Sequence, residues 1–265
     1  FAAACLSAVS ILFSPDWLIA RPNLGGLGSP MARWALATAE RSRLRAILDA
    51  VVANVFALDP PDVDWILRGC DLPREELTRY PKGADPKGFW RVEKDRDPEL
   101  RQTLLTIVAC RDLHEAIRSC KGDRDRAIAA FCGTLDPALV PDLPFLDPTS
   151  GWQLPETLRL ADYGLGHDER AKTPQPVRAR LGKRFLPWQL AQSPEDSWRE
   201  CEIHARNILG EAGFATLQAE LRGQGRIEAL ADEPTAAVAE QPAQYGLFGA
   251  SGAEPRGDPV RRRRR

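Results

Sequence analysis

The sequence has few of the residues that build metal centres, and their spacing is wrong for one. The cysteines stand at positions 5, 70, 110, 120, 132 and 201, with no C-x-x-C pair among them. The histidines, His114, His167 and His204, match no zinc-binding pattern. We therefore expect no metal site in this chain. Unpaired cysteines are typical of buried thiols in a reducing compartment, so we expect a cytoplasmic protein.

The sequence also lacks a long apolar run and a strong net charge. Residues 1–13 are apolar, but this run is shorter than the ~20 residues that span a bilayer, and no basic leader precedes it. We therefore expect no membrane partner. The net charge of −1 gives no global attraction to nucleic acid, so binding would have to depend on local clusters. Because the chain begins with Phe1, we interpret it as a fragment or the tail of a longer product.

What the sequence does contain is ordinary globular composition and one very regular stretch, 44–67. At 265 residues, with 43% hydrophobic and 28% charged residues, the chain can bury a sizeable core. We predict a helix over 31–58, with Asp59 as the N-cap of a second helix over 60–67. Apolar residues recur at the spacing of one helix face and predict a buried stripe made of Leu44, Ile47, Leu48, Val51, Val52 and Val55.

Similar patterns predict helices elsewhere and only short strands. Asp97 is the expected cap of a helix over 98–120, and Asp123 begins another that ends near Cys132. Ser193 begins a helix that reaches Gly210, and a second short helix follows it. A short strand is expected at 89–92. The predicted fold class is mainly α, an irregular helical assembly with few short strands and a disordered C-terminal tail.

Proline, glycine and low-complexity stretches divide the chain into predicted domains. These are the end of a preceding, DNA-recognition-like domain (1–30), a helical domain (31–135), a Pro-rich linker (136–151), a C-terminal helical module (152–223) and a disordered tail (224–265).

Several of these stretches resemble one family. "DAVVANVFALDPPDVDWIL", "DPKGFWRVEKDRDPELR" and "WQLPETLRLADYGLGHDERA" are similar to the C-terminal region of large adenine-specific DNA methyltransferases of the type IIG restriction–modification and phage-defence kind. Phe56-Ala57-Leu58 stands where that family usually has Tyr-Gly-Leu. The resemblance covers roughly 5–222. It implies a full-length enzyme that transfers a methyl group from S-adenosylmethionine to adenine in DNA.

The catalytic parts of that family are missing from this chain. Methyl transfer needs a glycine-rich cofactor loop and an N/D-P-P-Y/F tetrad whose ring stacks on the flipped base. Asp59-Pro60-Pro61-Asp62 has an acid where the ring must be, and we interpret it as a helix cap. Leu24 to Gly28 is not followed by a cofactor-domain pattern. We therefore assign no catalytic residue and no cofactor to this chain, and whether it belongs to an enzyme depends on the resemblance.

Basic residues interleaved with aromatics mark two candidate nucleic-acid-binding patches, since such sets neutralise phosphates and stack on bases. One lies over 79–96, the other over 170–188, and Arg21 is an added candidate because the resemblance places its segment near DNA. The candidate residues are Arg21, Lys87, Trp90, Arg91, Arg178, Arg180, Lys183 and Arg184. The alternative is that the aromatics anchor loops while the basic residues solvate the surface.

The resemblance thus implies a non-catalytic part that helps to bind or position DNA in a site-specific adenine methyltransferase. Its expected partners are double-stranded DNA and the upstream catalytic domain of the same polypeptide. An alternative from another class is a helical protein–protein docking module that joins the methylase to a helicase or nuclease subunit.

Overall fold

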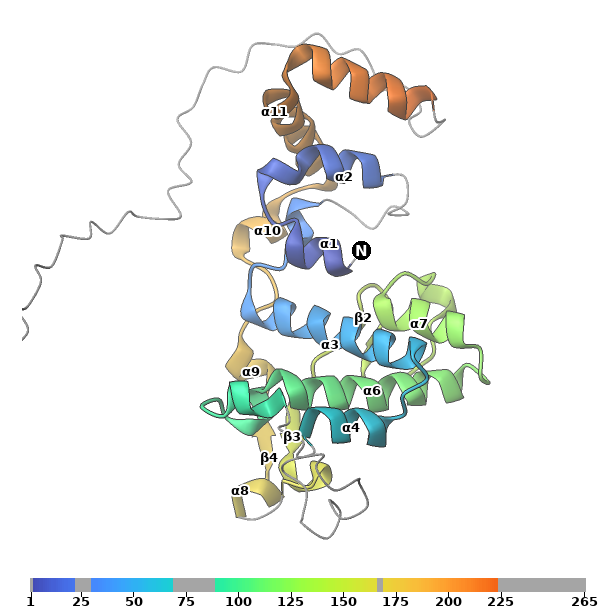
Figure 1. Ribbon diagram of the computed structural model, residues 1–265, viewed down its shortest axis with the longest axis vertical. Coiled ribbons are helices and arrows are strands. Elements are labelled where there is room, and N and C mark those ends of the chain that lie inside the picture. The colour runs from blue at the N-terminus through green and yellow to red at the C-terminus, as the bar shows by residue number, and fades with distance from the viewer. Residues whose placement is uncertain (1, 22–29, 69–88, 166–168, 224–265) are drawn as a thin grey trace, which may run out of the picture. The chain divides into compact units, whose positions relative to one another are not determined.

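The computed structural model describes residues 2–21, 30–68, 89–165 and 169–223, and these are mainly helical (Figure 1). Only two small two-stranded sheets accompany the helices in the described part. The predicted fold class is therefore confirmed. The predicted tail over 224–265 lies outside the described residues. No described helix has the length and apolar character needed to cross a membrane.

The centre of the fold is a group of three helices with α6 in the middle (Figure 1). They are α3 (Thr38–Val55), α4 (Pro60–Arg68) and α6 (Gln102–Ser119). The predicted pair of helices and its capped turn are confirmed. The Asp62 amide donates to Asp59 Oδ1 at 2.9 Å, and the Asp59 amide donates to Asp62 Oδ2 at 3.2 Å. This reciprocal capping satisfies amides that have no helical partner.

The start and the buried face of α3 differ from the prediction. Residues Met31–Arg33 form a 3-10 turn, η3, and the α-helix begins only at Thr38. The buried Ala46 and Ala53 share a helix face with Ser42 and Asp49, which hydrogen-bond α6, and Ala50 is buried beside them, so we place small residues on the side toward α6. On the same side, Thr106 Oγ1 donates to Asp49 Oδ2 at 3.0 Å.

Because α6 covers this small-residue face, part of the predicted apolar stripe is left uncovered. Leu44 and Ile47 are buried as expected, but Val52 and Val55 are 52% and 61% exposed. The prediction of one continuous buried stripe was therefore wrong at its C-terminal end.

The entry to α6 also differs from the prediction. Residues expected to form a strand make a 3-10 helix instead, η5 (Phe89–Glu93), and η6 (Pro98–Leu100) precedes α6. Asp97 does not cap the helix. The Glu93 carboxylate accepts from the amides of Gln102 and Thr103 at 3.0 and 3.1 Å. The return of Glu93 to the α6 N-terminus explains why its segment turns rather than extends.

A helix and a hairpin complete this side of the core. Helix α7 (Arg124–Cys132) starts as predicted, because the Arg126 amide donates to Asp123 Oδ1 at 3.0 Å. After η7 (Pro137–Leu139), strands β1 (Leu146–Asp147) and β2 (Gly151–Trp152) pair antiparallel. The fully buried Trp152 stacks on Phe131 with ring centroids 5.8 Å apart, and its Nε1 donates to Asp112 at 2.7 Å.

The two ends of the described chain pack on each other. Near the N-terminus are α1 (Ala2–Ser7), η1 (Ile11–Phe13) and α2 (Ser14–Ala20). After α10 (Pro187–Ala191), α11 (Pro194–Gly223) contacts α2 and η1. The Ser193 hydroxyl accepts from the Asp196 amide at 3.0 Å, and Gly210 interrupts the helix at φ 68°. Both the predicted start and the predicted break are confirmed.

A basic segment links the hairpin to α10. It contains β3 (Thr157–Arg159), η8 (Leu160–Tyr163), α8 (Glu169–Lys172), β4 (Pro174–Pro176) and α9 (Arg178–Leu181), and β3 pairs antiparallel with β4. The described residues, 2–21, 30–68, 89–165 and 169–223, belong to one compact unit. The domain boundaries drawn from the sequence stay predictions.

Candidate nucleic-acid interface

The first predicted basic patch is only partly within the described residues. Lys87 lies outside them, and Trp90 belongs to η5, without a described side chain. Arg91, on the same 3-10 turn, is exposed, and so is Lys94 just after it. Arg96 instead contacts Glu93, its Nη1 lying 3.3 Å from Oε1. Arg91 and Lys94 therefore face solvent, whereas Arg96 is neutralised locally.

The second patch is organised around a buried acid, Glu99, on η6. Glu99 is 0% exposed and accepts from Arg180 Nη1 at 2.8 Å. Arg170 Nη2 donates to the same oxygen, Oε1. Arg180 also reaches Asp97 Oδ2 at 2.5 Å, and the hydrogen bond from Arg180 lowers the pKa of Asp97 below its ordinary value. Two arginines of the basic segment are thus tied to two acids that precede α6.

A second buried acid, Glu40 on α3, holds the far end of the segment. Arg43 Nε and Nη2 donate to its two oxygens at 2.9 and 2.7 Å, and Arg184 Nε donates to Oε2 at 2.6 Å. Arg43 also donates to the carbonyls of Ser150 and Trp152 at 2.9 and 2.8 Å. Burial opposes ionisation of Glu40, but the hydrogen bonds from both guanidiniums outweigh it, so its pKa is lowered.

Arg43 is buried in spite of its charge. Its side chain is only 5% exposed. Its guanidinium satisfies a carboxylate and two backbone carbonyls of the hairpin, which explains how a charged group can be buried there.

Two of the three remaining candidates, Arg178 and Arg21, are also engaged. Arg178 donates from Nη2 to the Leu154 carbonyl at 2.7 Å and from Nη1 to Glu156 Oε1 at 2.8 Å. Arg21 lies 3.3 Å from Glu202 and 4.7 Å over the ring of Trp198. By contrast, Lys183 is exposed and makes no ion pair within the described part of the chain.

The arrangement changes what the basic segment can do chemically. Arg170, Arg178, Arg180 and Arg184 each share charge with a carboxylate, so a phosphate would have to compete with those acids. Arg91, Lys94 and Lys183 meet no such competition from an ion pair in the described residues. Whether any predicted residue contacts DNA stays a prediction.

Glu40 and Glu99, the two acids that organise this region, were not predicted from the sequence. Glu40 stands three residues before Arg43, a spacing that brings side chains together on a helix, and this was a usable signal. The partnership of Glu40 with Arg184 and of Glu99 with Arg180 spans 144 and 81 residues. Nothing local in the sequence indicates such pairs.

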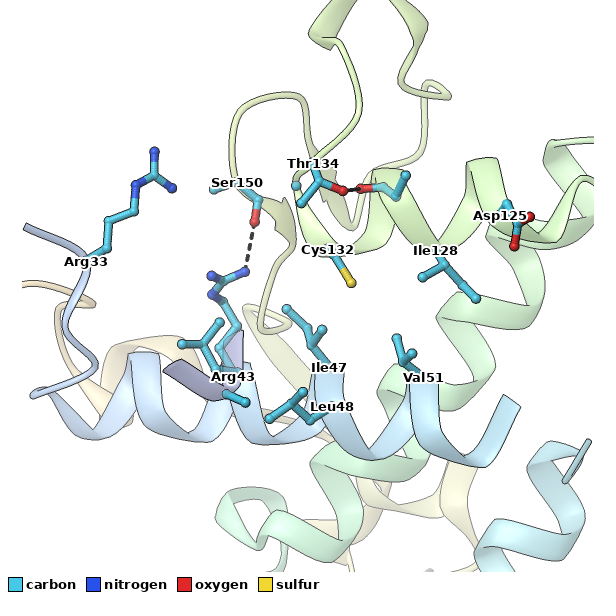
Figure 2. A pocket seen from close by; sticks show the side chains of 14 residues that line it. Arg33, Arg43, Ile47, Leu48, Val51, Asp125, Ile128, Cys132, Thr134 and Ser150 are labelled. Carbon is cyan, nitrogen blue, oxygen red and sulfur yellow. Dashed lines mark hydrogen bonds between the residues drawn. The ribbon is translucent and has the colours of Figure 1, made fainter. Parts of the chain in front are cut away.

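A groove lies between α3 and α7, beside the Glu40 cluster. It encloses a cavity of about 400 Å³. In Figure 2, Ile47, Leu48 and Val51 of α3 lie across from Ile128 and Cys132 of α7. Burial raises the pKa of the Cys132 thiol, so at neutral pH this side chain acts as an apolar group rather than a nucleophile.

The described residues contain no candidate metal-binding cluster. Nowhere in them do three or more histidine, cysteine or acidic side chains gather at a distance suited to a metal ion. His114, four residues after Cys110 on α6, belongs to no such group.

Comparison of the chain with models of protein families, with curated proteins and with solved structures finds no match.

Proposed function

We propose that this chain is the non-catalytic C-terminal part of a site-specific adenine DNA methyltransferase of restriction–modification or phage defence. Within that cytoplasmic enzyme it serves as a helical docking module, which holds other protein parts in place around the DNA. S-adenosylmethionine is the cofactor of the full-length enzyme and is bound by its catalytic domain. The sequence resemblance supports the parentage.

The observation that carries the docking role is the contrast between charged and apolar side chains. The arginines of the basic segment are paired with internal carboxylates, which weakens the field that would attract phosphates. Large apolar side chains remain exposed on several helices, among them Val52, Val55 and Phe56 at the end of α3. Contiguous exposed apolar side chains are typical of protein-binding surfaces.

A second candidate function is direct contact with DNA, favoured by the exposure of Arg91, Lys94 and Lys183. These side chains could contact phosphates without displacing an internal acid. Such contacts would position the duplex rather than read its sequence.

The nucleotide sequence upstream of the codon for Phe1 tests the parentage. We expect it to encode an N/D-P-P-Y/F tetrad and a glycine-rich cofactor loop in the same reading frame or in the adjacent gene. A different kind of domain in both places would refute the assignment.

Fluorescence anisotropy with a labelled duplex at low salt separates the two roles. The docking role predicts weak binding that is unaltered by Arg178→Glu, whose native partner Glu156 is exposed, once folding is checked by circular dichroism. Tight, salt-dependent binding that is lost on Arg91→Glu with Lys183→Glu would establish direct DNA contact instead. Co-elution with the catalytic polypeptide in size-exclusion chromatography is the positive test of docking.

A further inference from the structure

The 3-10 helix η5 presents two different ridges of side chains to solvent. In a 3-10 helix, side chains three residues apart lie one above the other, so Phe89 and Val92 form one ridge. Arg91 and Lys94 form a second ridge beside it, because the Lys94 amide donates to the Arg91 carbonyl and continues the turn. Phe89 and Val92 are 63% and 86% exposed, and both cations are exposed as well. An apolar ridge therefore lies beside a cationic one.

Most acids near these ridges are turned away from them. The carboxylate of Glu93, on the third side of η5, accepts from two amides at the start of α6 and is only 12% exposed. Asp97 pairs with Arg180 at 2.5 Å. Asp95 stays exposed, but it is one acid against the two cations of the ridge, which make no ion pair in the described ranges. The cationic ridge therefore keeps an excess of positive charge.

The two ridges match an unpaired strand of nucleic acid. At a rise of about 2 Å per residue, the two side chains of each ridge are about 6 Å apart along η5. Aromatic rings stack on the open face of a base, while Lys and Arg neutralise the phosphates beside it. A duplex hides the faces of its bases, so it would contact Arg91 and Lys94 but leave Phe89 uncovered. An unpaired strand engages both ridges.

A membrane surface and a partner helix match the ridges less well. Phe89 and Val92 carry fewer carbons than an acyl chain, and even a single myristoyl chain gives only marginal membrane binding. An amphipathic partner helix binds through several apolar anchors laid into a groove, whereas this ridge offers one apolar pair. Free cations beside one exposed aromatic ring favour a nucleotide strand.

We propose that η5 binds an unpaired DNA strand, with Phe89 stacked on a base and with Arg91 and Lys94 on neighbouring phosphates. The proposal rests on the second candidate function, direct contact with DNA, and specifies the form of the DNA and the residues that hold it. Because every base has a face on which a ring can stack, η5 holds the strand without reading its sequence.

Anisotropy titrations of the full chain with fluorescein-labelled oligothymidylate, and with a duplex of the same length, test the apolar ridge. We expect Phe89→Ala to weaken binding of oligothymidylate about tenfold and to leave duplex binding unchanged. The matched control is Phe56→Ala, at another exposed phenylalanine, which should alter neither. Circular dichroism checks that both variants fold. Equal affinities of Phe89→Ala and the parent chain for oligothymidylate would overturn the proposal.

The salt dependence of binding tests the cationic ridge. Arg91→Gln with Lys94→Gln removes two phosphate contacts, so the slope of log K against log salt should fall in magnitude by about 1.4 for oligothymidylate. The control, Arg118→Gln with Arg199→Gln, removes the same charge at two exposed arginines of α6 and α11. Equal changes of slope in the two double variants would show that net charge alone matters, and would refute the ridge.

Ultraviolet crosslinking gives a readout at η5 itself. A thymine stacked on Phe89 should be crosslinked to the peptide that contains this residue, as identified by mass spectrometry of the digested chain. Crosslinks confined to other peptides would contradict stacking at η5.

Further outcomes separate the alternatives. Tighter binding of oligouridylate than of oligothymidylate would assign the ridges to RNA and overturn the proposal. Binding to phosphatidylserine vesicles that Phe89→Ala abolishes would assign them to a membrane, with the same consequence. Binding of the duplex but not of oligothymidylate would leave direct DNA contact standing while this inference fails, and binding of neither would refute both.

Discussion

Arg184 donates from Nε to Glu40 Oε2 at 2.6 Å, which joins residues 144 positions apart in the sequence. The same carboxylate neutralises the buried Arg43, whose Nη1 in turn binds the carbonyls of Ser150 and Trp152. One acid thus connects α3, the β1–β2 hairpin and the end of the basic segment. Removing it should affect the whole fold rather than one surface.

We predict that Glu40→Gln lowers the free energy of unfolding by about 3–5 kcal/mol, because it leaves Arg43 buried without a counter-charge. Urea unfolding followed by circular dichroism measures the loss. The matched control is Glu115→Gln, which removes the acid of an exposed pair with Arg118 on α6 and should leave stability unchanged within error. Equal losses of unfolding free energy in Glu40→Gln and Glu115→Gln would show that the buried pairs of Glu40 with Arg43 and Arg184 stabilise the fold no more than an exposed pair does.

Glu99 and Asp97 bind the other arginines of the basic segment, Arg170 and Arg180. Loss of the buried acid should again destabilise the fold more than loss of the exposed one. Glu99 is fully buried and binds both Arg170 and Arg180, so Glu99→Gln should be strongly destabilising. Asp97 binds the same arginines from an exposed position, and Asp97→Asn should cost much less. Thermal unfolding of the two variants side by side checks the order. A larger drop in melting temperature for Asp97→Asn than for Glu99→Gln would contradict this order.

Asp112 should make stability depend on pH. Burial raises its pKa to about 6, and the hydrogen bond from Trp152 Nε1 only partly offsets this. Its ordinary value is 3.8, so between about pH 4 and pH 6 the folded state binds more protons than the unfolded state. The stabilising contribution is complete below the ordinary value and is lost as pH rises through about 6.

The variant Asp112→Asn isolates this effect, since its side-chain oxygen can still accept from Trp152. We expect the stability of the variant relative to the parent to rise by at most about 3 kcal/mol from pH 4 to pH 7. Urea unfolding of both proteins across this range measures the difference. A difference that stays constant, or that falls as pH rises, would show that the pKa of Asp112 is not raised in the folded state.

The backbone of Gly151 lies so close to the backbone of α7 at Phe131 that any side chain at this position would clash. Its φ is 76°, and a Cβ placed there would lie 2.4 Å from the Phe131 carbonyl oxygen. Gly122 has a φ of 84° but no atom within 4 Å of such a Cβ. We predict that Gly122→Ala costs about 1 kcal/mol, from backbone strain alone, and that Gly151→Ala costs about 2–4 kcal/mol. Chemical denaturation of both variants tests the difference, which should vanish if the hairpin can move away from α7.

Much of the fold could be predicted from the sequence because its determinants are local. Asp59, Asp123 and Ser193 each cap the helix that follows them, as their sequence contexts indicate. Asp97 looked equivalent but is bound by Arg180 instead, while Glu93 caps α6. That exchange depends on a residue 83 positions away, which no local pattern can reveal.

The candidate site was harder to predict, for the same reason. A basic segment with aromatic neighbours looks alike in sequence whether its arginines face solvent or internal acids. Arg180 and Arg184 face Glu99 and Glu40, which lie far upstream. The apolar stripe of α3 was recognised correctly as a helix face, but its periodicity could not tell which part α6 would cover. Packing of small alanines decided that outcome.

Methyl transfer to duplex DNA, measured with tritiated S-adenosylmethionine, tests the central claim most directly. The assay compares this chain, the catalytic polypeptide of the proposed parent enzyme, and the two together. We predict no transfer by the chain alone, weak transfer by the catalytic polypeptide, and full transfer when both are present. Transfer by this chain alone, or full activity of the catalytic polypeptide without it, would contradict the account.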